Sequence, residues 1–144
     1  MLPRLAAVIG AQYGDEGKGL VTDYLSDPST LVVRYNGGAQ AGHTVVTAQQ
    51  RHEFHHVGAG TFQGARTLLS RFFLVNPVVY AQERRELWQL GFDPVVYVDP
   101  SARVTTPYDM LINRAVEDKR AGARHGSCGM GIHETVERSG HEAY

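Results

Sequence analysis

The sequence predicts an α/β domain with a largely parallel sheet and flanking helices. Four short runs are apolar almost throughout rather than alternating, which is typical of strands covered on both faces. Helical segments lie between these runs, and glycine-rich loops follow the first two, as in P-loop-like nucleotide-binding domains. The runs, which we expect to be strands, are residues 5–9, 31–35, 67–75 and 95–98.

Two helices are predicted from their start and stop residues. Asn76 followed by Pro77 reads as an N-cap with proline at the first helical position, and Gly91 ends that helix. The Thr-Pro pair at 106–107 begins a second helix, which Gly122 ends. Apolar residues recur at helical spacing and predict the buried faces: Val79, Leu87 and Leu90 in the first helix, and Met110, Leu111 and Ala115 in the second.

Length and composition exclude several classes of protein. A chain of 144 residues predicts one domain, and 14 Lys+Arg against 15 Asp+Glu leave no overall basic field for nucleic acid or an anionic membrane. The single cysteine, Cys128, excludes an intramolecular disulfide, and no apolar run approaches the roughly 18 residues of a membrane span. We expect a cytoplasmic protein without nucleic-acid or membrane partners. The last residues are polar and glycine-rich, which suggests an incomplete domain.

The first glycine-rich loop is GAQYGDEGKG, residues 10–19. It follows the predicted strand at 5–9 and leads into a helical segment at 20–25, so its backbone N–H groups and the helix dipole favour an anion. Phosphate prefers the ammonium of Lys18, whereas the carboxylate of Asp15 beside phosphate implies a bridging metal or proton transfer. A plain turn is the alternative. The coincidence of strand, glycines, charges and helix favours a nucleotide site.

The second glycine-rich loop is GGAQAGHT, residues 37–44. Its spacing matches the phosphate-binding pattern G-x-x-x-x-G-K-[ST], except that His43 stands in the lysine position. An unperturbed histidine pKa of about 6.5 would let His43 donate a proton to a phosphoryl oxygen near neutral pH. The alternative is that His43 caps a turn. The presence of Asp15 on another loop favours an acid–base pair.

With both loops read, the chain resembles the adenylosuccinate synthetase family. Family members carry G-x-Q-W-G-D-E-G-K-G, then V-R-Y-x-G-G-x-N-A-G-H-T, then G-T-T-G-R-G-I-G. These line up in order with residues 10–19, 33–44 and 126–133 of this chain, the last reading GSCGMGIH. The resemblance implies a ligase of purine biosynthesis: the γ-phosphate of GTP passes to the 6-oxygen of IMP, and the amine of L-aspartate then displaces it.

The resemblance also implies roles for particular residues. Asp15 is the base that removes the purine N1 proton and a Mg²⁺ ligand, His43 is the acid, Lys18 holds phosphates, and Gly42 offers a carbonyl to Mg²⁺. The expected triphosphate-binding set is Gly14, Asp15, Glu16, Gly17, Lys18, Gly19, Gly42, His43 and Thr44. The expected monophosphate-binding set is Asp15, Lys18, Gln40, Ala41, Gly42, His43 and Cys128.

The chain departs from the family pattern mainly at the monophosphate site. Gln40 replaces asparagine, residues 127–128 replace two threonines by Ser-Cys, and Met130 replaces arginine. Such changes resemble the phage-type branch that ligates aspartate to dGMP with ATP or GTP as donor, so this acceptor is the alternative. Family enzymes are longer and form homodimers, so residues 1–144 resemble the N-terminal part of the domain. We expect this part alone to be nearly inactive, and an inactive nucleotide-binding fragment is a further alternative.

A histidine cluster, RHEFHHVGAG at residues 51–60, has the composition of a metal site. His52 and His56 would share a face only on a helix, whereas the flanking residues indicate a strand or turn. The strand or turn is therefore the favoured interpretation.

Overall fold

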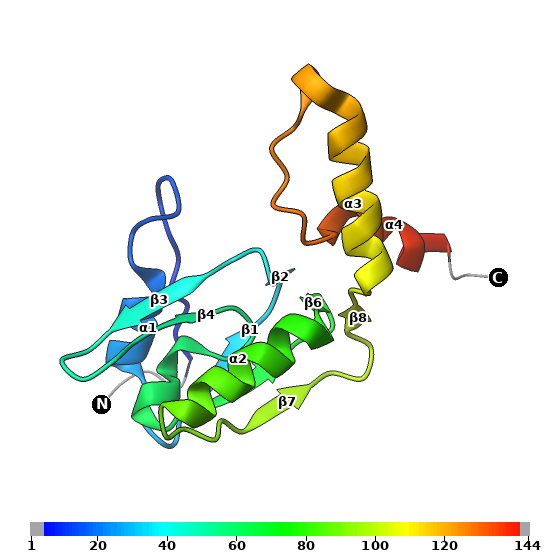
Figure 1. Ribbon diagram of the computed structural model, residues 1–144. Helices are drawn as coiled ribbons and strands as arrows, with labels where there is room; N and C mark the ends of the chain where they lie inside the picture. Colours follow the sequence, from blue (N-terminus) through cyan, green and yellow to red (C-terminus); the bar gives the residue numbers. More distant parts are fainter. Residues whose placement is uncertain (1–4, 142–144) are drawn as a thin grey trace.

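The computed structural model describes residues 5–141, and residues 1–4 and 142–144 lie outside the described part. Helices and strands alternate along the chain and form a sheet-containing body with a helical arm (Figure 1). The helices are α1 (Lys18–Leu25), α2 (Pro77–Gln89), α3 (Pro107–Arg120) and α4 (Ile132–His141), with 3₁₀ turns η1 (Ala59–Gln63) and η2 (Ala121–Ala123). The strands are β1 (Leu31–Arg34), β2 (Gly37–Gly38), β3 (His43–Val46), β4 (Arg51–Phe54), β5 (Arg66–Leu69), β6 (Phe73–Val75), β7 (Val96–Val98) and β8 (Arg103–Val104).

Most strand pairs are parallel, which confirms the predicted α/β class. One sheet has the order β1-β5-β7 and a second the order β2-β6-β8, and all four pairings within them are parallel. The pair β3-β4 is an antiparallel hairpin that the sequence did not reveal. The helix α2 runs alongside these strands, whereas α3 and α4 form the arm beyond β8 (Figure 1).

The apolar run at 67–75 is two strands and not the single predicted strand. β5 and β6 belong to different sheets, and the chain turns at residues 70–72 between them. Ser70 makes this turn: its hydroxyl donates to the carbonyl of Tyr35 at 2.6 Å and accepts the N–H of Phe72 at 3.1 Å. The polar Ser-Arg pair inside the apolar run was the available signal for this break.

The predicted strand at 5–9 does not form within the described residues. No described strand pairs with this segment, and its apolar side chains face solvent, with Leu5 88% and Ile9 83% exposed. A strand needs a neighbour to accept its backbone hydrogen bonds, so apolar composition alone does not produce one. The expected burial of strands on both faces is also incomplete, because Leu31 and Val33 of β1 remain 43% and 47% exposed.

Both predicted helix starts are confirmed by their cap hydrogen bonds. The Asn76 side chain accepts the N–H groups of Val78 and Val79 at 3.1 and 3.2 Å. At the start of α3, Thr106 and Asp109 form a reciprocal capping box. These side chains satisfy backbone donors that the first helical turn leaves unpaired.

The buried face of α3 is polar and not the apolar face that the sequence predicted. Asp109, Asn113 and Glu117 are the buried residues of this helix, whereas Leu111 is 59% exposed. The reason is the segment after α3, which returns along this face with matching groups. Arg138 of α4 donates to both carboxylate oxygens of Asp109 at 3.0 Å. Hydrogen bonding, not apolar contact, therefore decides which side of α3 is covered.

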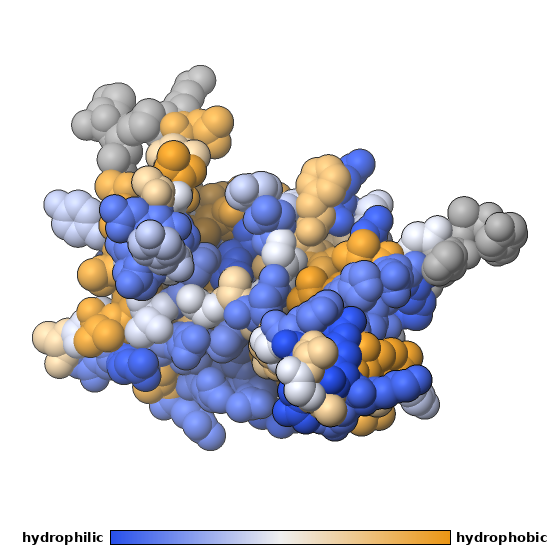
Figure 2. Space-filling view, turned by 90° about the horizontal axis from the view of Figure 1, so that it is seen from above, coloured by the Kyte–Doolittle hydropathy of each residue, from blue (hydrophilic) through white to orange (hydrophobic). Residues whose placement is uncertain are grey.

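The apolar core lies between the hairpin, η1 and α2. Its buried members are Val45, Phe54, Val57, Ala59 and Leu87, with Phe62, Tyr80, Phe92 and Val96 packed against them. Other apolar side chains stay at the surface, where Figure 2 shows them as orange patches among polar residues. Among residues 5–141, no helix combines the length and apolar character needed to cross a bilayer.

Candidate functional site

The first glycine-rich loop projects from the body before α1 (Figure 1) and is organised around Glu16. One oxygen of this carboxylate accepts the N–H groups of Gln12 at 2.8 Å and Gly14 at 3.3 Å. The other lies 2.8 Å from the ammonium of Lys18. The Lys18 contact and these N–H groups lower the pKa of Glu16 to about 2. Donors that the sequence assigns to phosphate are therefore held by an internal anion.

Asp15 takes no part in this internal network. The residue is exposed, and among residues 5–141 its carboxylate takes part in no hydrogen bond or ion pair, including any with His43. No hydrogen bond or ion pair thus joins the two members of the predicted acid–base pair directly. A solvent-facing carboxylate without a protein partner remains available to a proton or a hard cation such as Mg²⁺.

His43 begins β3 and lies against the start of α1. In the hairpin register His43 is opposite Phe54, which anchors its backbone to the core. A Cβ atom placed on Gly19 would lie 2.9 Å from the Cβ of His43, so only glycine allows the two loops to approach this closely. The structure therefore brings the two predicted loops together through Gly19 and His43.

The environment of His43 opposes its protonation. Burial, followed by the positive charges of Arg34 and Lys18 and by His55, lowers the pKa of His43 to about 4. The expectation of a near-neutral pKa is thus wrong for the chain without ligand, because sequence spacing does not reveal burial or these neighbours. At pH 7 the ring is neutral.

We expect an NMR titration of the free chain to give His43 a pKa near 4, and Lys18→Gln to raise it because one repelling cation is lost. The folded pKa lies below the unfolded value of about 6.5, so this group stabilises the fold fully above about pH 6.5. That stability is lost as the pH falls toward 4. A His43→Gln variant assigns the resonance, and a pKa near 6.5 in the free chain would contradict this description.

The third motif, residues 126–133, is tied to the polar face of α3. Glu117 accepts the N–H groups of Gly126 and Ser127 at 3.0 and 3.4 Å, and the Ser127 hydroxyl donates to Asn113 at 2.8 Å. Cys128 is exposed. The Ser127 hydroxyl is therefore engaged within the protein, beside the exposed Cys128 that is predicted for the monophosphate site.

This third motif also reaches the second loop. A Cβ on Gly38 would lie 3.0 Å from the terminal methyl of Ile132, the first residue of α4. The start of α4 is held near β8 by the hydroxyls of Thr135 and Thr105, 2.9 Å apart. All three motifs are thus linked in space, although Gln40 and Cys128 are exposed and, among the described residues, no hydrogen bond joins them.

Two charged residues near the loops were missed by the sequence interpretation. Arg34, just before the second loop, is 7% exposed, and its guanidinium carbon lies 5.2 Å from the centre of the Phe73 ring. Burial lowers the pKa of Arg34 to about 10, and the nearby Glu83 opposes this shift. Glu83 is 2% exposed in the middle of α2. The available signal was a charge inside an apolar strand or on the buried stripe of a helix.

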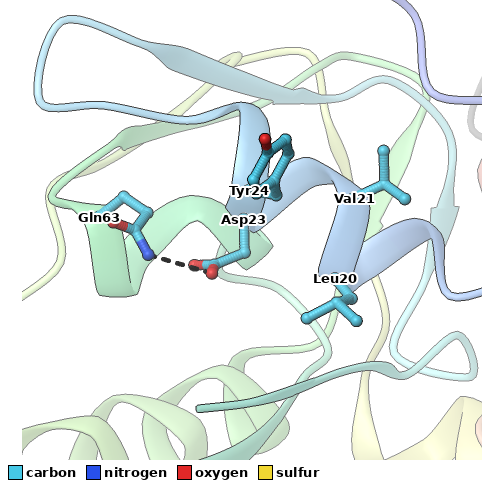
Figure 3. Close-up of a pocket in the computed structure, with 5 residues that line it drawn as sticks. All are labelled: Leu20, Val21, Asp23, Tyr24 and Gln63. Atoms are coloured by element: carbon cyan, nitrogen blue, oxygen red, sulfur yellow. Dashed lines mark hydrogen bonds between the residues drawn. The ribbon is translucent and has the colours of Figure 1, made fainter. Parts of the chain in front are cut away.

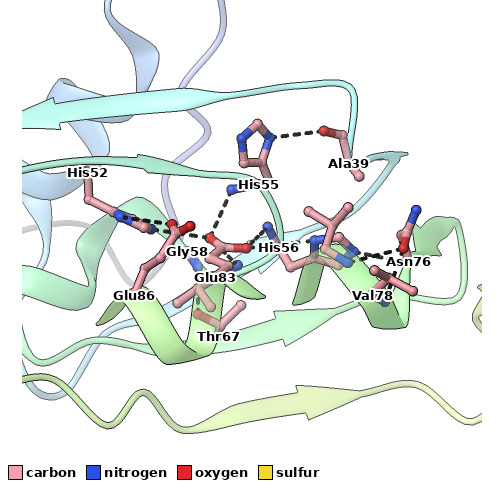
Figure 4. Close-up of polar contacts among 12 residues, drawn as sticks. Ala39, His52, His55, His56, Gly58, Thr67, Asn76, Val78, Glu83 and Glu86 are labelled. Atoms are coloured by element: carbon pink, nitrogen blue, oxygen red, sulfur yellow. Dashed lines mark hydrogen bonds and ion pairs between the residues drawn. The ribbon is translucent and has the colours of Figure 1, made fainter. Parts of the chain in front are cut away.

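The predicted strand in the histidine cluster is confirmed. His52 lies in β4, and no group of three potential metal ligands occurs within residues 5–141. His52 and His56 instead flank Glu83, and His56 accepts the N–H of Asn76 at 2.9 Å (Figure 4).

A surface pocket between α1 and η1 is separate from the predicted site. It is lined by Leu20, Val21, Asp23, Tyr24 and Gln63, and the Gln63 amide donates to Asp23 at 3.1 Å (Figure 3). None of the predicted nucleotide-binding residues lines this pocket.

Comparison with known proteins decides the family. The adenylosuccinate synthetase family profile matches residues 7–142, nearly the whole chain. The chain belongs to the adenylosuccinate synthetase family. It is 42% identical over 130 residues to the adenylosuccinate synthetase of a Cyanothece species, covering 89% of this chain and 29% of that protein. It is 39% identical over 140 residues to the enzyme of Gloeobacter violaceus, covering 95% of this chain and 32% of that protein.

Solved structures agree with this family assignment. The fully ligated adenylosuccinate synthetase of Plasmodium falciparum superposes with a TM-score of 0.77 at 27% identity, covering 90% of this chain and 32% of that one. The succinoaminodeoxyadenylate synthetase of cyanophage S-2L, bound to dGMP and dATP, shares the fold with a TM-score of 0.62 at 20% identity over 88% of this chain and 36% of that one. The chain therefore spans about a third of the length of these adenylosuccinate synthetase relatives.

Proposed function

We propose that residues 1–144 form the N-terminal part of an adenylosuccinate synthetase domain that ligates L-aspartate to IMP with GTP as phosphoryl donor. The observation that carries this proposal is the meeting of the three family motifs. Gly19 of the first lies against His43 of the second, and Gly38 of the second lies against Ile132 in the third. Donor phosphates and the purine monophosphate would then share one site between these loops.

In this proposal Asp15 is the base for the purine N1 proton and Lys18 holds phosphates. Removing that proton makes the 6-oxygen a better nucleophile toward the γ-phosphate. His43 donates its ring N–H to the transferring phosphoryl oxygens, and their negative charge raises its pKa from the low value of the free chain. The cytoplasm is the proposed location and a homodimer the proposed assembly of the complete enzyme.

Mg²⁺ fits the groups that the chain offers. The exposed Asp15 carboxylate and the carbonyl of Gly42 are hard oxygen ligands of the kind that Mg²⁺ takes alongside phosphates and water. When bound, the ion would neutralise developing charge on the phosphates. Asp15 and Gly42 are therefore the proposed ligands.

A second acceptor, dGMP, is supported by the residues at the monophosphate site. The Cys128 thiol is exposed, and a thiol is a weaker hydrogen-bond donor than the threonine hydroxyl of the family. Together with Gln40 and Met130, this change alters the part of the site that contacts the acceptor and leaves Asp15 and His43 in place. ATP would be the alternative donor in that case.

Calorimetric titration of the chain with IMP, dGMP, GTP and ATP tests this proposal. We expect one purine monophosphate and one triphosphate to bind, and we expect turnover with aspartate to be very low for these residues alone. Binding of dGMP and not IMP would replace the acceptor, and binding without any turnover in a full-length form would indicate a nucleotide-binding relative. In an active full-length form, Asp15→Asn should abolish turnover and leave the fold intact, whereas retained turnover would exclude Asp15 as the base.

A further inference from the structure

The carboxylate of Glu83 occupies an unusual place in the fold. It lies in the middle of α2 on the same face as Leu87, one turn away, and is 2% exposed. A buried carboxylate destabilises a protein by several kcal/mol unless hydrogen bonds or opposite charges compensate it. The partners of Glu83 therefore show what the residue holds in place.

Three consecutive backbone N–H groups converge on this carboxylate (Figure 4). His55 and Val57 donate to one oxygen at 2.9 and 3.3 Å, and His56 donates to the other at 2.7 Å. Burial alone would raise the pKa of Glu83, but the contacts with His52 and His56 and these N–H groups lower it to about 2. The residue is therefore ionised throughout the physiological range and fixes the backbone that follows β4.

The ring of His56 is set in one tautomer beside this carboxylate. Its Nε2 accepts the N–H of Asn76, so this nitrogen carries no proton. In the neutral ring the proton then resides on Nδ1, which lies 3.7 Å from Glu83. His52 lies on the other side, 3.9 Å from Glu83. The two rings therefore flank the carboxylate, and its hydrogen bonds come from the three backbone N–H groups.

The fixed segment in turn holds the second glycine-rich loop. The Nδ1 of His55 lies 2.9 Å from the carbonyl oxygen of Ala39, and because a carbonyl only accepts, this nitrogen is the donor. Ala39 is 1% exposed and precedes Gln40 in the loop. The residue before His55 is Phe54, the register partner of His43. Residues 54–55 therefore contact both ends of the 39–43 segment.

We propose that Glu83 is a positioning residue for the loop at 37–44. The ionised carboxylate orients residues 55–57, the His55 ring then fixes the Ala39 carbonyl, and the loop is held in the shape in which His43 and Gln40 meet a purine monophosphate. The loop's ligand rests on the proposed function. The chain of contacts from Glu83 to Ala39 is independent of it.

The matched variants are Glu83→Gln and Glu86→Gln. Glutamine at 83 keeps the size of the side chain but turns one acceptor into an N–H donor facing backbone N–H groups. Glu86 lies three residues after Glu83 in α2 and is 47% exposed. Its carboxylate accepts from Gln82 at 2.9 Å and lies 4.0 Å from His52, but it accepts no hydrogen bond from residues 55–57. We expect ¹⁵N spectra of Glu83→Gln to show changed amide shifts at 39–43 and faster proton exchange at the His55 ring, and we expect Glu86→Gln to show neither.

Comparing the affinities for a purine monophosphate and a nucleoside triphosphate distinguishes a positioning role of Glu83 from a general loss of structure. For Glu83→Gln we expect monophosphate affinity to fall about tenfold, the equivalent of one hydrogen bond. We expect triphosphate affinity to fall less, because only the far end of this loop, residues 42–44, belongs to the expected triphosphate-binding set. Equal losses for both ligands, or unchanged shifts at 39–43, would overturn the proposal. Absence of nucleotide binding by the unaltered chain would contradict the proposed function, and the NMR comparison would still test the role of Glu83.

A second pair of variants keeps the test decisive if Glu83→Gln fails to fold. His55→Leu removes the donor to Ala39 and leaves the Glu83 carboxylate and its three backbone partners in place. His55→Gln offers a side-chain N–H to the same carbonyl. We expect the shifts at 39–43 to change in His55→Leu and to return toward the original values in His55→Gln. Identical loop spectra for all three chains would contradict the proposed link.

Discussion

A Phe54→Ala variant is expected to lower the free energy of unfolding by about 3–5 kcal/mol, as large-to-small substitutions of buried aromatic residues do. Phe54 is fully buried and makes edge contacts with two rings, at centroid distances of 4.7 Å to His52 and 5.2 Å to Phe62. A single domain is stable by only about 5–15 kcal/mol, so the loss is a large share of the total.

Urea denaturation followed by circular dichroism measures this loss. Phe72→Ala is the matched control, because Phe72 is 70% exposed and lies in the turn between β5 and β6. We expect its effect to stay within about 0.5 kcal/mol. Because Phe54 is opposite His43 in the hairpin, Phe54→Ala should also move the His43 resonance. A loss no larger than that of Phe72→Ala would show that the hairpin does not depend on this core.

A Gly131→Ala variant is expected to detach α4 from α3. Gly131 has a φ of 68°, which costs an alanine about 1–2 kcal/mol. An added Cβ would also lie 2.6 Å from the carbonyl carbon of Asp109 and 2.7 Å from the nitrogen of Met110. Both are backbone atoms at the start of α3 and cannot rotate away, so overpacking adds about 1–3 kcal/mol.

Hydrogen exchange along α4 measures this detachment. Gly91→Ala is the matched control, because its φ is 88° but an added Cβ would meet no atom within 4 Å. Both variants place an alanine at a positive φ, but only Gly131→Ala also brings a Cβ against backbone atoms. We expect α4 amides to lose protection in Gly131→Ala only. Equal protection of α4 in both variants would show that an added Cβ at residue 131 does not detach α4.

Local signals in the sequence were sufficient for the helix starts. Asn76-Pro77 and Thr106-Pro107 predict α2 and α3 because their cap hydrogen bonds join residues two or three positions apart. The parallel pairing also followed from apolar runs between helices. Features decided by distant partners were missed, since the polar face of α3 depends on groups donated from beyond residue 125.

At the candidate site, too, local features could be predicted from the sequence and features that depend on distant residues could not. The motifs gave the loops and their residues, and Gly19 against His43 confirms that two of them meet. The low pKa of His43 depends first on burial and then on Arg34, Lys18 and His55, which approach it only in the fold. The role of Glu83 could not be predicted either, because its partners are 26–28 residues away in the sequence.

The carboxylate of Glu16 already occupies the hydrogen-bond donors that the first loop would offer to an incoming anion. Its oxygens already satisfy Lys18 and the N–H groups of Gln12 and Gly14. An incoming phosphate must therefore exchange with a resident ion, and only the difference between the two sets of contacts contributes to affinity. Small, singly charged anions gain little by such an exchange. A polyphosphate with several charged oxygens would gain more, so a loop that binds phosphate in this way would select ligands by charge before any base or sugar is contacted.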